Sequence, residues 1–212
     1  MSEAVDLVCA RLRGLAAARV IVAVAGPPGG GKSTFAAALV QALDASAPGT
    51  AALVPMDGFH YDDAVLRARG TIERKGAPHT FDVGGLLALL RRLRAHDEPE
   101  VAVPIFDRRL EIARAAASIV PSSTRVLIVE GNYLLLDEPD WARLRPFFDL
   151  TVMLREDRDV LEQRLIARWL SYGFDAAAAR AKAERNDLPN ADIVAARSIA
   201  ADITLVDGRP AA

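Results

Sequence analysis

Gly26-Pro27-Pro28-Gly29-Gly30-Gly31-Lys32-Ser33 lies between an apolar run and a segment of helical spacing. It matches the pattern G-x-x-x-x-G-K-[ST] of a phosphate-binding loop (P-loop), whose glycines let backbone N–H groups converge on phosphate oxygens. The run 19–25 before it is rich in β-branched residues, which favours a buried strand, and 32–43 after it has helical spacing. Because strand, loop and helix are all present, a Gly-rich turn with a solvated lysine is the weaker interpretation.

The P-loop predicts nucleotide binding. The positive end of the following helix dipole favours phosphate at this loop. Lys32 is expected to reach the β- and γ-phosphates as a catalytic group, and the Ser33 hydroxyl to bind Mg²⁺. ATP and Mg²⁺ are therefore the predicted cofactors. The loop residues assigned to ATP are Gly26, Gly29, Gly30, Gly31, Lys32, Ser33 and Thr34.

The rest of the chain alternates between strand and helix patterns. Short apolar runs predict further strands at 51–56, 125–130, 150–154 and 203–206, and an amphipathic helix is expected near 7–15. Helical spacing predicts further helices at 83–94, 141–147, 157–172 and 176–184. This alternation predicts an α/β fold of the P-loop NTPase type, a three-layer sandwich. Its sheet has five parallel strands with helices on both faces and a small lid.

We expect one domain over residues 1–212, a length that suffices to bury a full core. Two segments rich in charge, at about 57–80 and 101–121, fit the alternation less well and are interpreted as insertions over the active edge of the sheet. The lid is expected at about 164–186. Ligands of such sheets collect at the carboxyl ends of the strands, where the motifs described here fall.

Composition limits the partners. A net charge of −2 and a pI near 6.0 provide no global positive field, which disfavours nucleic acid as a partner. The single cysteine, Cys9, cannot form an internal disulfide, and the apolar run 20–26 is too short to cross a bilayer. We therefore expect a cytoplasmic protein without a membrane partner; the sequence carries no signal for its oligomeric state.

Three further segments carry a family resemblance. They are Val54-Pro-Met-Asp57-Gly-Phe-His60-Tyr61, Val129-Glu130-Gly131-Asn132-Tyr133, and 161–168 with its two arginines. Together with the P-loop they resemble the phosphoribulokinase, uridine kinase and type I pantothenate kinase superfamily over about 20–206. The resemblance implies an ATP-dependent kinase, a phosphotransferase that phosphorylates a hydroxyl of a small metabolite: a sugar, a nucleoside or a pantothenate-like alcohol.

The resemblance also assigns roles. Asp57 is expected to accept the proton of the attacking hydroxyl, a task that suits a carboxylate within hydrogen-bond reach; the alternative is a simple Asp-Gly turn. Glu130, with Ser33, is expected to hold Mg²⁺; the alternative is a strand-end acid paired with an arginine. Arg164 and Arg168, four residues apart on one helix face, are expected to bind ATP from a lid; the alternative is a solvated surface pair.

The acceptor side departs from the uridine kinase pattern. The segment 103–107 resembles its Pro-x-Tyr-Asp stretch, but Phe106 replaces the tyrosine, and Glu111 stands near the position of a nucleoside-contacting histidine. Phe174 stands where a further lid arginine is expected. These differences change the hydrogen-bonding groups of the pocket and disfavour uridine. The residues predicted to contact the acceptor are His60, Tyr61, Asp107 and Arg114.

Two other functional classes remain open. A regulatory GTPase needs a guanine-reading Asn-Lys-x-Asp motif, which the chain lacks, and the match Asp82-x-x-Gly85 does not follow an apolar strand. A P-loop protein that binds ATP without an acceptor is opposed by the intact set Lys32, Ser33, Asp57 and Glu130.

Overall fold

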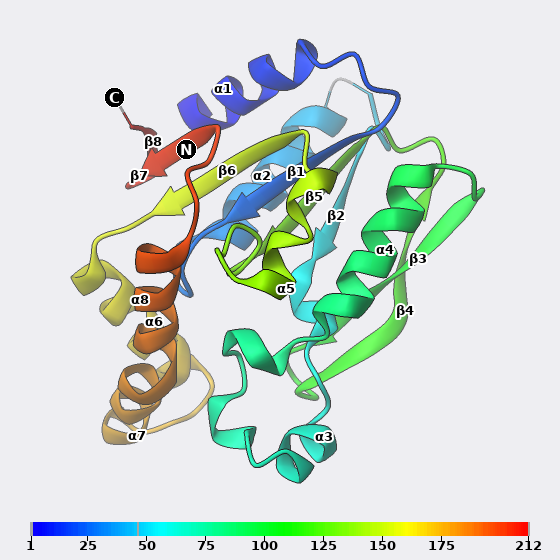
Figure 1. Ribbon diagram of the computed structural model, residues 1–212. Coiled ribbons are helices and arrows are strands. Elements are labelled where there is room, and N and C mark those ends of the chain that lie inside the picture. Colours follow the sequence, from blue (N-terminus) through cyan, green and yellow to red (C-terminus); the bar gives the residue numbers. More distant parts are fainter. Residues whose placement is uncertain (1, 46, 212) are drawn as a thin grey trace.

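The central sheet of the protein is parallel over most of its width (Figure 1). A computed structural model describes residues 2–45 and 47–211. Within this part of the chain the sheet has six strands in the order β2-β5-β1-β6-β7-β8. Its parallel strands are β1 (Val20–Ala25), β2 (Ala51–Pro55), β5 (Val126–Gly131), β6 (Leu150–Arg155) and β7 (Ile203–Val206). All five predicted strands are confirmed.

One short strand of this sheet was not predicted. β8 (Arg209–Pro210) pairs antiparallel with the edge strand β7. A tight turn joins the two, with Asp207 and Gly208 both at positive φ, 51° and 74°. Two residues are too few to show a period of two in the sequence, which is why the pattern gave no signal for this strand.

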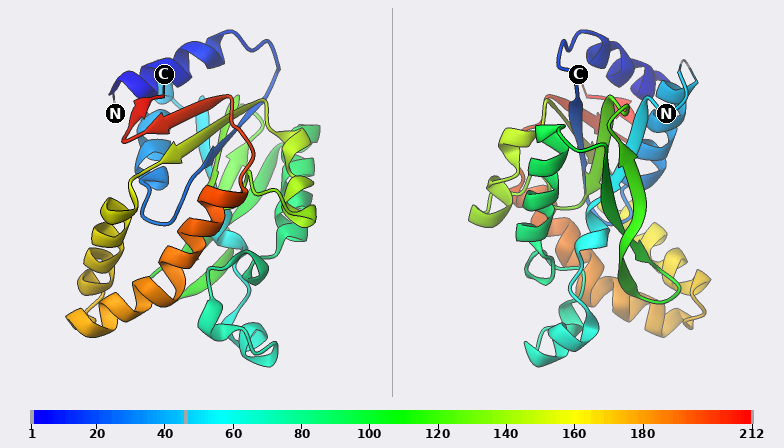
Figure 2. Two further views of the ribbon diagram at one scale, coloured as in Figure 1. Left: turned by 60° about the vertical axis from the view of Figure 1, so that its left-hand side comes forward. Right: turned by 90° about the vertical axis from the view of Figure 1, so that its right-hand side faces the viewer.

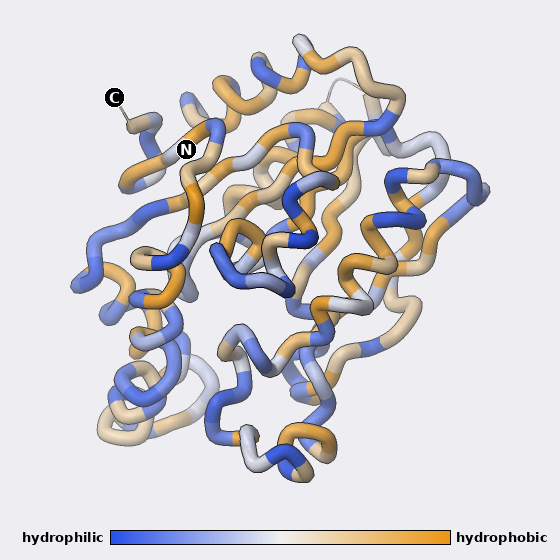
Figure 3. Tube along the Cα trace, viewed as in Figure 1, coloured by the Kyte–Doolittle hydropathy of each residue, from blue (hydrophilic) through white to orange (hydrophobic). Residues whose placement is uncertain are grey.

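Helices cover both faces of the sheet (Figure 2). Side chains of β1 alternate between the faces: Val20, Val22 and Val24 pack with α1 (Ser2–Arg13) and α2 (Lys32–Asp44). Those of Ile21 and Ala23 pack on the other face with α4 (Val83–Ala95), α5 (Pro139–Ala142) and α8 (Leu188–Arg197). Figure 3 shows hydrophobic strands between these layers, as expected for strands buried on both faces. The predicted three-layer arrangement is confirmed.

Two helix predictions need correction. The helix expected at 141–147 is split into α5 and the 3₁₀ turn η4 (Arg145–Phe147), because Pro146 cannot donate the hydrogen bond that would continue α5. α8 was not predicted at all. Its start, Leu188-Pro189-Asn190, has the composition of a turn, yet Pro189 falls in the first helical turn, where its missing N–H is tolerated.

The two predicted insertions have distinct structures. Residues 57–80 hold one α-helix, α3 (Asp63–Ala68), between the 3₁₀ turns η1 (Met56–Phe59), η2 (Ile72–Arg74) and η3 (Pro78–Thr80). The second insertion is an antiparallel hairpin of β3 (Glu100–Asp107) and β4 (Ile112–Pro121), separate from the main sheet. β3 packs against η1 and against the edge strand β2. Both insertions therefore approach the end of β2.

A third hydrophobic cluster joins the expected lid to the sheet domain. α6 (Arg158–Ser171) contributes Leu161 and Leu165, and these pack with Leu188 and Ala191 of α8. α7 (Ala176–Lys182) leads into a π-helical turn, η5 (Ala183–Asp187), so only the first part of the helix predicted at 176–184 is α-helical. No helix in the described residues is both long and apolar enough to cross a membrane.

Arg19 fixes the amino end of β1 to neighbouring segments. Its guanidinium donates to four backbone carbonyls, those of Leu93, Pro121, Ser122 and Thr124, at 2.9–3.1 Å. The residue is only 3% exposed, so these carbonyls have little access to water. Buried carbonyls that lose their donor are costly, and Arg19 therefore holds α4 and the β4–β5 connection against the sheet.

We expect Arg19→Met to lower the free energy of unfolding by about 2–4 kcal/mol, because it removes a buried donor from four carbonyls. The carbonyls of Pro121 and Ser122 keep a second partner, the N–H of Thr124 and His96 Nε2 respectively, so the cost falls mainly on the other two. Arg11→Met, on the exposed face of α1, is the matched control and should stay within about 0.5 kcal/mol of the unchanged protein. Urea unfolding of both variants measures the effect. Equal stability of the two variants would show that the carbonyls find other partners.

Candidate active site

Three strand ends meet at one edge of the sheet. Parallel pairing places Val24 opposite Glu130 in β1 and β5, and Pro55 opposite Glu130 in β2 and β5. The P-loop follows β1, Asp57 lies two residues beyond β2, and Glu130 stands near the end of β5. The register of the sheet thus brings together groups that are far apart in the sequence, as is usual for ligand sites of parallel sheets.

The P-loop turns sharply between β1 and α2. Gly29 and Gly31 have φ values of 76° and 81°, in the left-handed region that favours glycine. Gly31 precedes the first residue of α2, so the amino end of the helix opens at the loop. A helix start with free N–H groups and a favourable dipole is suited to bind phosphate oxygens.

Lys32, Ser33 and Glu130 form the charged floor of the site. Lys32 is 8% exposed and uses one donor on the carbonyl of Pro27 at 2.8 Å. Ser33 Oγ donates to Glu130 Oε2 at 3.2 Å. Burial lowers the pKa of Lys32 and raises the pKa of Glu130, while the opposite charge of each opposes the shift of the other. Both groups thus lack the solvation that their charged forms need, and phosphate oxygens and a cation can supply it.

Asp57 reaches the site through a close backbone contact. A Cβ on Gly58 would lie 2.3 Å from the carbonyl oxygen of Pro104, so only glycine lets β3 pack so closely on η1. This contact brings the hairpin turn to Asp57, whose carboxylate forms an ion pair with Arg108. The Asp-Gly pair therefore does more than form a turn, because its glycine seats the hairpin beside its carboxylate.

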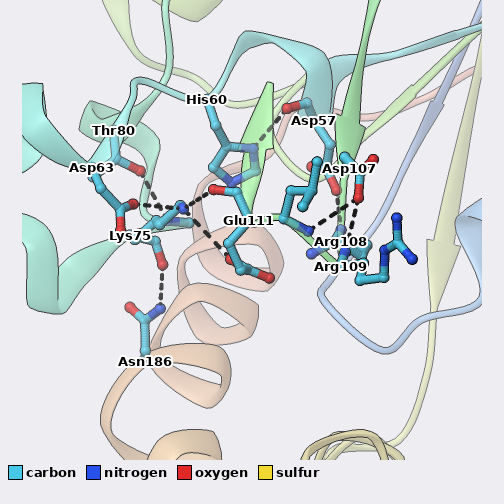
Figure 4. A network of polar contacts seen from close by, with 12 residues as sticks. Asp57, His60, Asp63, Lys75, Thr80, Asp107, Arg108, Arg109, Glu111 and Asn186 are labelled. Atoms are coloured by element: carbon cyan, nitrogen blue, oxygen red, sulfur yellow. Dashed lines mark hydrogen bonds and ion pairs between the residues drawn. The ribbon is translucent and has the colours of Figure 1, made fainter. Parts of the chain in front are cut away.

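A cleft of about 1300 Å³ joins the P-loop to both insertions and to the lid. The predicted residues among those that line it are Gly29, Gly31, Lys32, Ser33, Thr34, Asp57, His60, Glu130, Arg164 and Arg168. Figure 4 shows the side of the cleft that the insertions form, where Asp57, His60, Lys75, Arg108 and Glu111 lie near one another. The fold therefore gathers most of the predicted site residues in one cavity.

His60 presents a hydrogen-bond acceptor to this cleft. Its Nδ1 lies 2.8 Å from the carbonyl oxygen of Asp57, and a carbonyl can only accept, so Nδ1 carries the proton. Burial lowers the pKa of His60, which keeps the ring neutral. The ring packs between Phe81 and Phe106, with centroids 4.1 and 4.7 Å away. Nε2 is consequently a fixed lone-pair site.

The two arginines of α6 are held by partners. Arg164 donates to the carbonyl of Gly29 at 3.3 Å and pairs with Glu156, so it contacts the P-loop directly. Arg168 donates to Asp187 at 2.9 Å, and Trp169 Nε1 donates to the other oxygen of the same carboxylate at 2.6 Å. The two arginines lie on one side of α6, as their spacing predicts, and both line the cleft.

Five predicted residues lie outside the cleft lining. Tyr61 packs under Arg69, whose guanidinium carbon is 4.2 Å from the ring centre, and Asp107 accepts from the N–H groups of the hairpin turn and from Arg114. Gly26 packs against Leu154, and the N–H of Gly30 donates to Pro27. The placement of Tyr61, Asp107 and Arg114 therefore gives no support to direct contact with an acceptor.

Sequence reasoning missed several cleft residues. Lys75 donates to Asp63 at 2.7 Å and to the carbonyl of Glu111 at 2.8 Å, which links the two insertions (Figure 4). Arg108 and Asp187 also line the cavity. The only sequence signal for Lys75 and Arg108 was their place in the two charge-rich segments, and Asp187 had none, because these positions depend on loop conformation and not on a repeating pattern.

Magnesium fits the residues at the P-loop. The described residues contain no cluster of three or more His, Cys, Asp or Glu side chains able to hold a metal. Mg²⁺ in nucleotide sites needs no such cluster, since it usually binds one or two protein oxygens together with phosphates and water. The hydrogen-bonded pair of Ser33 Oγ and Glu130 supplies such oxygens beside the buried ammonium of Lys32.

A parallel sheet with a P-loop after its first strand, and a carboxylate at the end of a neighbouring strand, defines a P-loop nucleotide-binding protein. The comparisons with known proteins make this class specific. A protein-family model described as "Phosphoribulokinase / Uridine kinase family" matches residues 21–197. The chain belongs to this family. It is an ATP-dependent kinase that phosphorylates a hydroxyl group of a small metabolite.

Individual relatives agree with this membership. The crystal structure of a "putative fructose transport system kinase" from Silicibacter sp. TM1040 is 42% identical, with a TM-score of 0.88 over 95% of this chain and 98% of that one. A "Putative uridine kinase" from Schizosaccharomyces pombe is 32% identical over 88% of this chain and 83% of its own length. The "Uncharacterized protein YggC" from Escherichia coli is 36% identical over 87% and 76%, respectively.

We expect Gly58→Ala to displace the hairpin from Asp57, because the new Cβ would overlap the carbonyl of Pro104. The predicted result is a loss of about 1–3 kcal/mol in the free energy of unfolding. Gly84→Ala is the control: it lies in α4 without a close contact and should be neutral or stabilising by up to about 1 kcal/mol. Chemical unfolding of both variants measures this, and two stable variants would contradict the close approach.

Proposed function

We propose that the chain is a single kinase domain in which Asp57 activates the acceptor hydroxyl while the P-loop holds MgATP. One observation carries the proposal: Lys32, Glu130 and Asp57 line one cleft at the carboxyl edge of the sheet. Phosphoryl transfer needs alignment and charge stabilisation more than covalent help, and this arrangement supplies both. Lys32 neutralises the β- and γ-phosphates as charge moves onto the leaving oxygen.

The role of Asp57 as the general base rests on its hydrogen bonds. In an Asp-Gly turn the carboxylate usually accepts from a nearby backbone N–H. Among the described residues, the Asp57 carboxylate has only the Arg108 guanidinium as a partner, and its own turn is closed by backbone and His60 contacts. A carboxylate that its turn does not use, at the edge of a nucleotide cleft, supports the catalytic role.

Ser33 and Glu130 are the proposed protein groups for Mg²⁺, and Arg164 and Arg168 the proposed lid groups for ATP. Bound Mg²⁺ would neutralise the charge of the phosphates. Arg164 already contacts the loop backbone at Gly29, which supports a position near the phosphates. The lid is proposed to comprise about 164–186, and the cytoplasmic location stays a prediction.

The acceptor is proposed to be a sugar or another polyol. A nucleobase is usually held by stacking on an aromatic face. Phe81 and Phe106 are the aromatic rings that pack on His60 in this part of the cleft, and both are under 10% exposed. The remaining groups on this side include Asp63, Glu111 and His60 Nε2, which accept hydrogen bonds from hydroxyl groups.

The relative at 42% identity supports this choice, since its name refers to a fructose transport system. The name of the yeast relative favours a nucleoside acceptor. Phe81 and Phe106, the rings that pack on His60, are however too buried to stack on a nucleobase. A regulatory protein without an acceptor is opposed by the polar chamber that the two insertions build beside Asp57.

Release of ADP from MgATP, screened over sugars, polyols, nucleosides and pantothenate, tests the proposal. We expect turnover with a sugar or polyol and none above background with nucleosides. Excess EDTA should abolish the activity and Mg²⁺ should restore it, because the phosphates need the cation. Preferred turnover of a nucleoside would contradict the acceptor class, and metal-independent transfer would contradict the roles of Ser33 and Glu130.

Asp57→Asn keeps the size of the side chain and removes the proton acceptor. With the best acceptor of the screen, kcat should fall by about 10²–10⁴-fold while the affinity for ATP stays unchanged. The melting temperature should change little. A fall below tenfold together with a lowered melting temperature would instead assign Asp57 to the turn.

A further inference from the structure

Arg108 occupies an unusual place for a residue of a hairpin turn. It follows β3 directly, and its side chain reaches back to the end of β2, where it pairs with Asp57 (Figure 4). The side chain is 52% exposed, yet it lines both the main cleft and a smaller cavity of about 340 Å³ beside it. Asp57, Ser33 and Glu130 also line both cavities, so Arg108 stands at the phosphoryl-transfer edge.

A closed ring of contacts fixes Asp57 at two points. The carboxylate is held by Arg108, and the guanidinium of Arg108 lies over the ring of Phe106, with its carbon 5.2 Å from the ring centre. Phe106 packs on His60, and His60 Nδ1 donates to the backbone carbonyl of Asp57. A carboxylate held through both its side chain and its backbone has little rotational freedom left to lose on reaction.

The ion pair uses only one oxygen of the carboxylate. Arg108 contacts Oδ2, and within the described residues no group donates to Oδ1. A hydroxyl group can therefore donate to Oδ1 without displacing the arginine. Arg108 sets the orientation of the carboxylate and leaves the oxygen that a nucleophile needs.

Arg108 also compensates the negative charge of Asp57. Asp57 lies in the field of Lys32 and of a second carboxylate, Glu130, and it stands where an anionic phosphate must approach. An uncompensated carboxylate at this place would repel the phosphate. The guanidinium cannot lose its proton, so it offsets this repulsion throughout the reaction.

We propose that Arg108 is the positioning residue for Asp57: it holds the carboxylate in the orientation in which Oδ1 receives the acceptor hydroxyl, and it compensates its charge. The proposal rests on the proposed function, since it assumes that Asp57 is the base. Arg108 acts through Asp57 and contacts neither the P-loop nor, on this assignment, the acceptor.

A double-mutant cycle tests the proposal with the acceptor of highest turnover in the screen. Arg108→Met should lower kcat by about 10–100-fold through misplacement of Asp57, with KM for ATP unchanged. Arg108→Lys keeps the charge and should lose less. Arg109→Met removes the same charge from the neighbouring turn residue, whose side chain does not line the cleft, and should match the unchanged enzyme.

The double variant Asp57→Asn/Arg108→Met gives the decisive value. If Arg108 acts only through Asp57, the kcat of the double variant lies within about threefold of the kcat of Asp57→Asn alone. Effects that multiply, or full activity in Arg108→Met, would overturn the proposal. If Arg108→Met melts below the assay temperature, the same cycle is run with Arg108→Lys.

The proposed function fails by a different result. In that case the unchanged enzyme shows no acceptor-dependent ADP release, or Asp57→Asn keeps its turnover. If only the Arg108 proposal fails, the unchanged enzyme still releases ADP with the acceptor, and Asp57→Asn still loses turnover. The two outcomes are therefore distinguishable.

Discussion

The parallel pairing of β5 with both β1 and β2 is the constraint on which the site depends. It sets Glu130 opposite Val24, two residues before the P-loop, on one side and opposite Pro55, two residues before Asp57, on the other. A slip of one residue would turn the Glu130 side chain to the other face of the sheet. Alternate side chains of β1 and β5 pack into different helical layers, so such a slip would disrupt the packing on both faces.

Charge balance at this edge explains the choice of residues. A buried ammonium and a buried carboxylate lie side by side at Lys32 and Glu130, and burial disfavours the charged form of each. Without a ligand, this arrangement has a desolvation penalty that lowers the stability of the fold. Phosphate oxygens near Lys32 and a divalent cation near Glu130 would offset that penalty. Asp57 and Arg108 repeat the pattern on the acceptor side with a less buried pair.

The acceptor side is built from segments outside the sheet. Lys75 joins α3 to the hairpin turn. Asn186 of η5 donates to the carbonyl of Lys75 at 2.6 Å, and Tyr133 donates to the carbonyl of Gly76 at 2.6 Å. Figure 3 shows hydrophilic and hydrophobic residues mixed along these outer segments, in contrast to the strands of the central sheet. They are held by hydrogen bonds and ion pairs, so small changes in sequence can alter the acceptor while the nucleotide site stays constant.

The sequence alone determined the parallel strands, the helical layers and the groups at the strand ends. Strands buried on both faces are apolar runs, helices show helical spacing of their apolar residues, and parallel strands end at one edge of the sheet. It did not determine α8, which begins with the composition of a turn, or β8, which is too short for a period. Only the tertiary structure decided that Arg108 meets Asp57 and that Tyr61 turns away from the cleft. These positions depend on the close packing of Gly58 on Pro104 and on hydrogen bonds within loops, and neither leaves a periodic signal in the sequence.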